Sequence, residues 1–547
     1  MKFEVNLSPE TSRRYREAGH WVGRSITDYL DDAVARTPGK MAIVAPGVRL
    51  TYAQLDVEVN SVAAKLRALG IGKGDVVSIQ LNNCPEFVIT HLACSKIGAV
   101  TNPLLPLYRA SELTYILNTA KTVAAVIPNH YRKCDYPAMY AQMWPTLPDL
   151  KHVLVVGGEG HDGMRSFESL RSTMGAPPQR VETEAFDGDD VTALIFTSGT
   201  ESNPKGVMHS HNTHLYGTLA MAKLLGLTGD DVVWTPSPVG HGTGYQWGVR
   251  QAITLGATLV LQDGWDADEA LRLIAQERCT FTLAATPFAS MLMESPLLGE
   301  LDLSSFRIFA CAGATIPEKL GIAMRDRIGC TLVGMWGMTE CFVGSSSAPG
   351  DPGSRLWGSD GKAMPGCELA IFDEARTQRL PKGEVGELAV RGPNVSLGYF
   401  SDPLRTRETF SSEGWLFSGD LATMDEEGYI RLVGRKKEII NRGALKISVR
   451  QMEEYLLDHP KVRHIAMVGV PDPTLGEKSC AFVVARDKAT LELAEISRFL
   501  DERGVAKYKF PEYLVLLEEL PTTPSGKIQK YLLREGFVKG AYAVLQA

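Results

Sequence analysis

A loop of small hydroxyl residues, glycines and one lysine, at residues 197–206, is the part of the chain best suited to chemistry. It follows a short apolar run at 193–196, which is typical of a buried strand. Glycines and hydroxyl side chains let N–H and O–H groups converge on phosphate oxygens, and the lysine adds positive charge. The chain has no Gly-Lys-Ser or Gly-Lys-Thr, which excludes a Walker A loop. The loop therefore indicates a phosphate site of another kind, with a polar hairpin turn as the alternative.

The elements that must position this loop alternate between helix and strand. Over residues 50–256, amphipathic stretches alternate with short apolar runs, and the pattern repeats over residues 257–335. Such alternation predicts α/β layers built on largely parallel strands. Over residues 366–429, short strands separated by Gly, Asp and Pro turns predict a β-barrel-like piece, and a compact α+β tail follows.

A length of 547 residues is too great for one hydrophobic core, so several subdomains are expected. The predicted fold class is α/β. We expect a large N-terminal domain over residues 1–436, made of two α/β subdomains and a β-barrel-like subdomain. A small, mobile α+β C-terminal domain is expected over residues 437–547.

Composition narrows the class of protein. The net charge of -7 argues against a nucleic-acid partner, which would require a basic face. The nine cysteines never form CxxC, which is typical of a reducing cytoplasm. The first residues lack the apolar h-region expected of a signal peptide, and no apolar run reaches the roughly 18 residues of a membrane span. We therefore expect a cytoplasmic enzyme without integral membrane contact.

Further motifs follow the loop in order along the chain. They are CAGATIP (311–317), GMWGMTE (334–340), GEVGELAVRG (383–392), GWLFSGDLA (414–422), GRKKEIINRG (434–443) and LPTTPSGKIQK (520–530). Together with the loop they resemble the AMP-forming acyl-CoA synthetases of the adenylate-forming superfamily, and cyclohexanecarboxylate-type CoA ligases in particular. The likeness covers about residues 50–533. It implies that a carboxylic acid reacts with ATP and Mg²⁺ to give acyl-AMP, and that the acyl group then passes to coenzyme A.

The resemblance also implies roles for residues around the nucleotide. Small residues on one side and an aromatic ring on the other suit adenine, and a carboxylate suits the two ribose hydroxyls. The implied adenine and ribose residues are Gly313, Ala314, Thr315, Trp336, Gly337, Met338, Asp420 and Arg435. The implied phosphate-binding residues are Thr197, Ser198, Gly199, Thr200, Glu201, Ser202 and Lys205. Glu340 and Thr200 would hold Mg²⁺, which prefers oxygen ligands.

The catalytic residues implied by the family are Lys527, Thr339, Glu340 and His241. Lys527 would neutralise charge on the carboxylate and α-phosphate oxygens, and His241 would lie beside the acyl carboxylate. Lys437 occupies the position of a hinge about which the C-terminal domain rotates between two half-reactions. On the coenzyme A side the implied residues are Gly443, Ala444, Leu445 and Lys446.

Several of these residues have simpler interpretations when taken singly. Trp336 would be a core residue, Asp420 a turn aspartate and Lys527 a solvated cation. The cluster of His209, His211 and His214 could suggest a transition-metal site. The histidines lack partnering Cys or Asp residues, so a metal site is disfavoured.

The phosphate loop departs from the family pattern at two positions. Glu201 and Ser202 stand where the family usually has Thr and Gly. At about 5 Å, with an effective dielectric near 20, the carboxylate would repel each phosphate charge by roughly 3 kcal/mol unless a cation neutralised it. This motivates an alternative in which adenylation is weakened and the enzyme is specialised for acyl-AMP plus coenzyme A. A partner ligase that supplies acyl-AMP would then be required, and a homodimer is also compatible with the sequence.

Other functions remain open from the sequence. A stand-alone adenylation enzyme that loads a carrier protein is a further alternative, as is a luciferase-like oxygenase. A non-catalytic nucleotide-binding protein is disfavoured, because the chain keeps Lys527, Glu340, Asp420 and Thr339. The stretch SPVGHGTG (237–244) carries no aspartate for an α-amino group, which favours a non-amino acid. Gly240, Gly242 and Gly244 around His241 suggest room for a bulky acid, cyclic acids included, as in natural-product biosynthesis.

Overall fold

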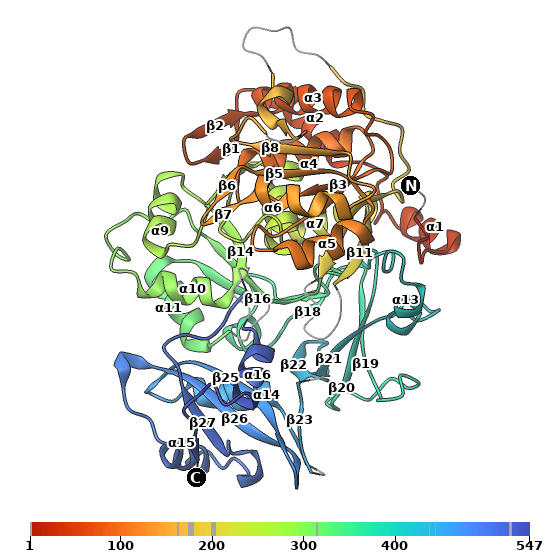
Figure 1. Ribbon diagram of the computed structural model, residues 1–547. Helices are drawn as coiled ribbons and strands as arrows, with labels where there is room; N and C mark the ends of the chain where they lie inside the picture. The colour runs from red at the N-terminus through yellow and green to blue at the C-terminus, as the bar shows by residue number, and fades with distance from the viewer. Residues whose placement is uncertain are drawn as a thin grey trace.

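The computed structural model describes residues 3–546 except 161–162, 173–179, 198–203, 313–315, 437, 444 and 524–527. Two large sheets form the first half of the molecule (Figure 1). The seven-stranded sheet has the order β11 (Lys205–Ser210), β10 (Val191–Thr197), β4 (Val100–Pro103), β3 (Val76–Ile79), β5 (Thr122–Pro128), β8 (His152–Val156) and β9 (Arg165–Ser166). All of its neighbouring strands are parallel except the β10–β11 pair.

The nine-stranded sheet is also mainly parallel. Its order is β18 (Lys362–Ala363), β17 (Ser345–Ser346), β16 (Thr331–Trp336), β15 (Ile308–Ala312), β14 (Phe281–Ala285), β12 (Val232–Thr235), β13 (Thr258–Leu261), β1 (Met41–Ala45) and β2 (Val48–Thr51). The antiparallel pairs lie at the two ends of the sheet. Apolar runs form these strands because parallel strands are buried on both faces.

Helices cover both faces of each large sheet. The largest core lies between the sheets and is filled by α2 (Ile26–Arg36), α3 (Tyr52–Ala68), α4 (Pro85–Lys96), α7 (His211–Leu225), the π-helix η3 (Thr243–Arg250) and α8 (Gln251–Leu255). The outer face of the seven-stranded sheet packs on α5 (Ala110–Thr119) and α6 (Tyr136–Met143). The outer face of the other sheet packs on α9 (Ala267–Gln276), α10 (Thr286–Glu294) and α11 (Glu318–Ile328). The expected α/β layers are confirmed.

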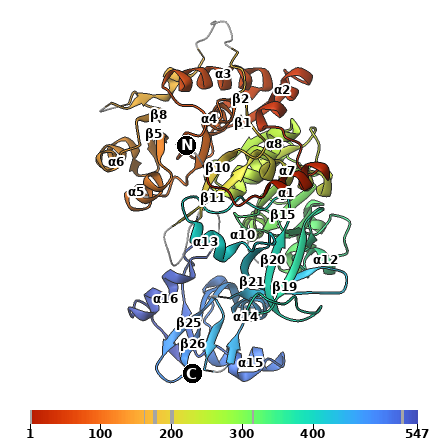
Figure 2. The same cartoon turned by 90° about the vertical axis from the view of Figure 1, so that its right-hand side faces the viewer.

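A four-stranded antiparallel sheet lies between the large sheets and the C-terminal domain (Figure 2). Its strands are β19 (Glu368–Phe372), β20 (Gly386–Arg391), β21 (Leu416–Met424) and β22 (Ile430–Arg435), and α13 (Pro403–Thr409) precedes β21. This sheet is the β-rich piece expected from the turn pattern. The chain leaves it at Arg435 and enters the next sheet at Ile440.

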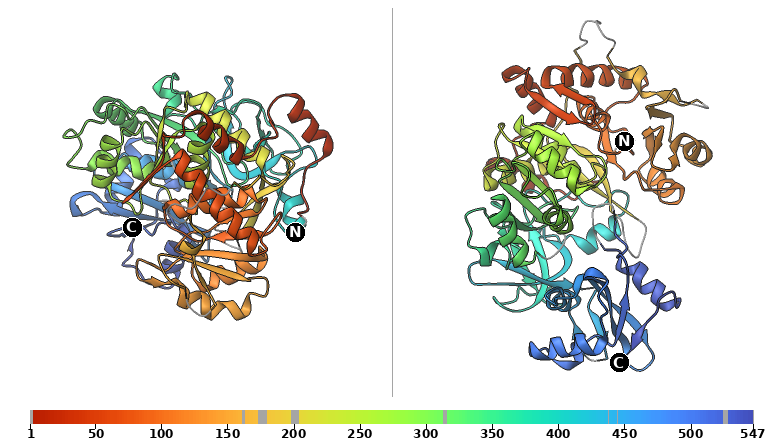
Figure 3. Two further views of the ribbon diagram at one scale, coloured as in Figure 1. Left: turned by 90° about the horizontal axis from the view of Figure 1, so that it is seen from above. Right: turned by 90° about the vertical axis from the view of Figure 1, so that its left-hand side faces the viewer.

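The C-terminal domain forms a separate lobe at one end of the molecule (Figure 3). Its six-stranded sheet contains β23 (Ile440–Arg442), β24 (Leu445–Ile447), β25 (Val462–Asp472), β26 (Gly476–Ala485), β27 (Tyr513–Leu516) and β28 (Leu545–Gln546). One core packs the sheet on α14 (Val449–Leu457) and α15 (Leu493–Glu502), and another on α16 (Lys530–Val538). Among the described helices, none combines the length and apolarity needed to cross a bilayer.

Candidate active site

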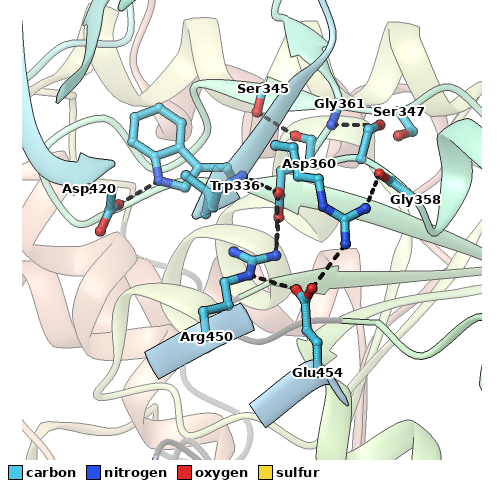
Figure 4. A network of polar contacts seen from close by, with 12 residues as sticks. Trp336, Ser345, Ser347, Gly358, Asp360, Gly361, Asp420, Arg450 and Glu454 are labelled. Carbon is cyan, nitrogen blue, oxygen red and sulfur yellow. Dashed lines mark hydrogen bonds and ion pairs between the residues drawn. The ribbon is translucent and has the colours of Figure 1, made fainter. Parts of the chain in front are cut away.

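Three of the residues expected around adenine and ribose meet in one polar cluster. Trp336 ends β16, Asp420 lies in β21, and Arg435 ends β22 directly opposite Asp420. The indole Nε1 of Trp336 donates to Asp420 Oδ2 at 2.8 Å (Figure 4), and Arg435 Nε lies 2.9 Å from Oδ1. The negative charge of Asp420 is the main cause of the raised pKa of Arg435. Each carboxylate oxygen is thus oriented while keeping a further lone pair for a hydroxyl donor.

Glycines allow the chain after β16 to turn sharply. A Cβ on Gly337 would overlap the carbonyl oxygen of Phe342, and a Cβ on Gly344 would overlap the ring of Trp336. Met338 lies partly buried in the same turn. The turn therefore fixes the indole of Trp336. It also fixes the backbone that leads, after Gly337 and Met338, to Thr339 and Glu340.

A single tyrosine connects the base of the phosphate loop to Glu340. Thr197 and Lys205 face each other at the loop end of the β10–β11 hairpin, and Lys205 Nζ lies 5.1 Å from the centre of the Tyr399 ring. The Tyr399 hydroxyl donates to Glu340 Oε1 at 2.7 Å. Glu340 is only 5% exposed. The Lys205 ammonium group and the Glu340 carboxylate thus both lie against the side chain of Tyr399. The remaining carboxylate lone pairs of Glu340 fit a hard divalent ion.

His209 supports the backbone of Thr339, the residue before Glu340. Its Nε2 lies 2.8 Å from the backbone oxygen of Thr339, so Nε2 carries the proton, and its Nδ1 lies 3.1 Å from Thr213 Oγ1. Burial lowers the pKa of His209 to about 3, which keeps the ring neutral. No group of three or more His, Cys, Asp or Glu side chains arranged for a metal occurs in the described part of the chain.

His241 lies at the start of the π-helix η3. The backbone N–H of Thr243 donates to His241 Nδ1 at 3.2 Å, so the neutral ring carries its proton on Nε2. The glycines around it have a different role from the one expected. A Cβ on Gly240 would overlap Leu104, and a Cβ on Gly244 would overlap Pro238. These two glycines allow close backbone approach and open no space for an acyl group, because carbonyl groups occupy it.

The ring of Phe342 packs against two buried histidines, His209 and His214. Phe342 adopts a left-handed backbone conformation with φ 55°, which is unfavourable for a bulky residue. Its ring lies 4.4 Å from the ring of His209, 5.0 Å from that of His214 and 6.4 Å from that of Trp247. A Cβ on Gly242 would lie 3.6 Å from Phe342 Cε1. The segment that supplies Glu340 therefore also supplies an apolar wall near His241.

Charged contacts hold the C-terminal domain against Asp360 and strand β22. Arg450 of α14 lies 3.0 Å from Asp360 and 3.1 Å from Glu454, and Arg431 of β22 donates to Glu454 at 2.9 Å (Figure 4). These side chains are mostly buried, except Arg431. The network sets the orientation of the domain.

Several expected residues cannot be placed with these clusters. Ser198, Gly199, Thr200, Glu201, Ser202, Gly313, Ala314, Thr315, Lys437, Ala444 and Lys527 lie outside the described residues. Gly443, Leu445 and Lys446 belong to the β23–β24 hairpin, which points away from the N-terminal domain (Figure 1). The structure therefore does not bring the coenzyme A side residues to the Asp420 cluster.

Comparison with known families agrees with this geometry. Residues 30–400 match the family model described as AMP-binding enzyme, and residues 451–527 match the AMP-binding enzyme C-terminal domain. The chain belongs to the AMP-binding enzyme family. The medium-chain fatty-acid–CoA ligase of Escherichia coli (strain K12) is 39% identical, covering 98% of this chain and 95% of the relative. The 2-hydroxy-7-methoxy-5-methyl-1-naphthoate–CoA ligase of Streptomyces carzinostaticus is 32% identical, covering 96% and 95%.

A solved structure is similar over nearly the whole chain. The anthranilate CoA ligase AuaEII in complex with anthranoyl-AMP superposes with a TM-score of 0.87 at 26% identity, covering 95% of this chain and 98% of that one. The AMP-binding enzyme described here is thus an AMP-forming carboxylic acid–CoA ligase. Ligases of this kind use ATP and coenzyme A.

Sequence reasoning missed three residues of this AMP-binding enzyme. Tyr399 lies in the run LGYF at 397–400, a segment that the motifs did not include. His209 was considered only for a metal, although its ring supports the backbone of Thr339. Phe342 follows the GMWGMTE motif by two residues, and nothing in its residue type signals a left-handed conformation.

Proposed function

We propose that this ligase converts a non-amino carboxylic acid through acyl-AMP to acyl-CoA, with bulky and cyclic acids within its range. The supporting observation is the Asp420 carboxylate, oriented by Trp336 and Arg435. The geometry of this carboxylate suits the two hydroxyls of a ribose. Glu340 and Lys205 both contact Tyr399, and the phosphates of the nucleotide would lie beside them.

Each side chain then has a defined part in adenylation. Glu340 and Thr200 would hold Mg²⁺, which would neutralise phosphate charge when bound. Lys205 and Thr339 would contact phosphate oxygens, and Lys527 would stabilise negative charge on the reacting oxygens. His209 holds the Thr339 backbone in place through its neutral ring.

The acid would lie between His241 and Phe342. The protonated Nε2 of His241 can donate to a carboxylate oxygen, and Phe342 and Trp247 offer apolar contact area. No aspartate in residues 237–244 is available for an α-amino group. The named activities of the relatives include a medium-chain fatty acid and a naphthoate, which supports both straight and cyclic acids.

Thioester formation requires a second domain orientation. The β23–β24 hairpin would turn about Lys437 toward the acyl-AMP, and Gly443, with φ 62°, would let the backbone approach the thiol. The observed orientation would then be the one in which the acid is adenylated. Rotation would break the contacts of Arg450 and Glu454 with the N-terminal domain.

A panel of carboxylic acids tests this function. The purified ligase is incubated with ATP, Mg²⁺, coenzyme A and fatty, aryl, alicyclic or amino acids, and AMP and acyl-CoA are measured by chromatography with mass detection. We expect acyl-CoA from fatty, aryl or alicyclic acids and none from amino acids. A preference for amino acids, or transfer to a carrier protein and not to coenzyme A, would contradict the proposal.

A second candidate function follows from the sequence of the phosphate loop. Glu201 and Ser202 stand where the family usually has Thr and Gly, and a carboxylate near the departing pyrophosphate would favour an enzyme specialised for acyl-AMP plus coenzyme A. Pyrophosphate–ATP exchange separates the two functions. Strong exchange by the unmodified protein excludes the specialised enzyme, whereas exchange that appears only in the Glu201→Thr/Ser202→Gly variant supports it.

A further inference from the structure

A fully buried arginine lies at the inner end of the π-helix that begins beside His241. Arg250 has an exposed fraction of 0% and closes η3 (Thr243–Arg250). Its Nη1 lies 3.2 Å from His91 Nε2. Its Nε and Nη2 have no hydrogen-bond partner among the described residues. Arginine is rarely buried without a partner, because desolvation of its charge is costly.

No negative charge compensates this guanidinium in the described surroundings. His91 accepts from Arg250, so its proton lies on Nδ1, 2.9 Å from Thr101 Oγ1. Burial is the main cause of the low pKa of His91, and the charge of Arg250 lowers it further. The same two causes lower the pKa of His214, so both histidines stay neutral. Burial also lowers the pKa of Arg250 itself.

The neighbouring side chain, Gln251, also lacks hydrogen-bond partners among the described residues. Gln251 follows Arg250, is buried, and has neither amide nitrogen nor amide oxygen paired with a described residue. Two adjacent residues thus present unpaired donors inside the core. π-Helical turns occur frequently at functional sites, where the wider spacing redirects side chains.

A continuous layer of rings connects Arg250 to the proposed acyl site. The guanidinium lies 5.9 Å from the centre of the Tyr245 ring, and this ring lies 5.6 Å from that of His214. His214 in turn lies 5.0 Å from Phe342, the wall beside His241. Arg250 follows His241 by nine positions, which is at most about 14 Å along a helix axis.

We infer that Arg250, with Gln251, forms an inner binding site for a distal oxygen of the acyl substrate, a second carboxylate or a carbonyl being its best ligand. The inference rests on the proposed placement of the acid between His241 and Phe342. The acid would enter with its reacting carboxylate at His241, and its far end would accept hydrogen bonds from Nε and Nη2 of Arg250. An oxygen there compensates the buried charge, whereas a methyl group does not.

Binding of stable acyl-adenylate analogues tests this site without requiring catalysis. Acyl-sulfamoyl-adenosines of octanoic, decanoic and dodecanoic acid are compared with analogues of equal length that end in a ketone or a carboxylate. For the unmodified ligase we expect the best distal-oxygen analogue to bind on the order of tenfold to a hundredfold more tightly than its methyl counterpart. Arg250→Met should abolish this preference, while the exposed control Arg325→Met should retain it.

The outcomes separate this inference from the proposed function. If every methyl analogue binds the unmodified ligase as tightly as its oxygen-bearing counterpart, the inference is overturned, whether or not Arg250→Met folds. Arg250→Lys keeps the charge but loses the planar pair of donors, and should retain only part of the preference. Absence of acid-dependent acyl-CoA formation with every acid in the panel would instead contradict the proposed function.

Discussion

Replacing Arg450 with methionine should alter the balance between the two half-reactions. The Arg450 Nη2 atom lies 3.0 Å from one oxygen of Asp360 and 3.3 Å from the other, and the two side chains are 20% and 14% exposed. A charge-assisted hydrogen bond between partly buried groups contributes about 1.5–3 kcal/mol. Loss of about 2 kcal/mol from one orientation corresponds to a shift of roughly thirtyfold in the domain equilibrium.

The direction of the effect follows from the hairpin. Because β23–β24 points away from the Asp420 cluster in the observed orientation, Arg450→Met destabilises the orientation proposed for adenylation. Pyrophosphate–ATP exchange should therefore fall by up to roughly thirtyfold. The single-turnover reaction of supplied acyl-AMP with coenzyme A should be unchanged or faster.

A matched control crosses the same domain boundary. Arg463 and Glu294 form an ion pair at 2.6 Å, but their side chains are 45% and 46% exposed, so the pair is worth at most about 1 kcal/mol. Arg463→Gln should change the ratio of the two half-reaction rates by less than about fivefold. If Arg450→Met slows both half-reactions by the same factor, or if the control has an equal effect, the reasoning about domain orientation is wrong.

Three further predictions concern the active-site end of the sheets. Tyr399→Phe removes the donor to Glu340 at a cost of about 1.5–3 kcal/mol and should raise KM for Mg-ATP more than it lowers kcat, as steady-state kinetics will show. Because the pKa of His209 in the folded protein is about 3, below the value near 6.5 for an unfolded chain, the unfolded state binds more protons between these values. As pH drops below about 6.5, this group should lower the free energy of unfolding by about 1.4 kcal/mol per pH unit. In the His209→Gln variant, the free energy of unfolding measured by denaturant titration at a series of pH values should depend less on pH. Gly337→Ala places a Cβ on the Phe342 carbonyl and should lower stability by about 1–3 kcal/mol or more, measured by thermal unfolding, with little change for an alanine at an exposed glycine.

The sequence predicts the layers of the fold because its apolar runs are short and separated by amphipathic helices. Strands such as Val76–Ile79 are buried throughout, so their pattern is unambiguous. The Trp336–Asp420 contact was expected only through motif resemblance, because 84 positions separate the two residues and no local pattern links them. Arg250 could not be found this way, since its burial depends on elements far apart in the sequence.

The glycines near His241 also show what the sequence alone cannot predict. Glycine removes a side chain, but the sequence does not show what takes its place. At Gly240 it is the backbone at Leu104, at Gly244 it is the backbone of the preceding turn, and at Gly242 it is an aromatic ring. Space in a site is a property of the assembled fold, and residue type alone cannot predict it.

The short segment between β22 and β23 has a consequence for the acyl-AMP intermediate. Arg435 is bonded to the carboxylate proposed to hold the ribose, and only four residues separate it from Ile440, the first residue of β23. The C-terminal lobe is therefore tethered beside the proposed ribose site, so the proposed rotation would need little displacement at that point. An acyl-AMP held at Asp420 could remain in place throughout the rotation, which would protect a hydrolysable mixed anhydride from water between its formation and its capture by the thiol.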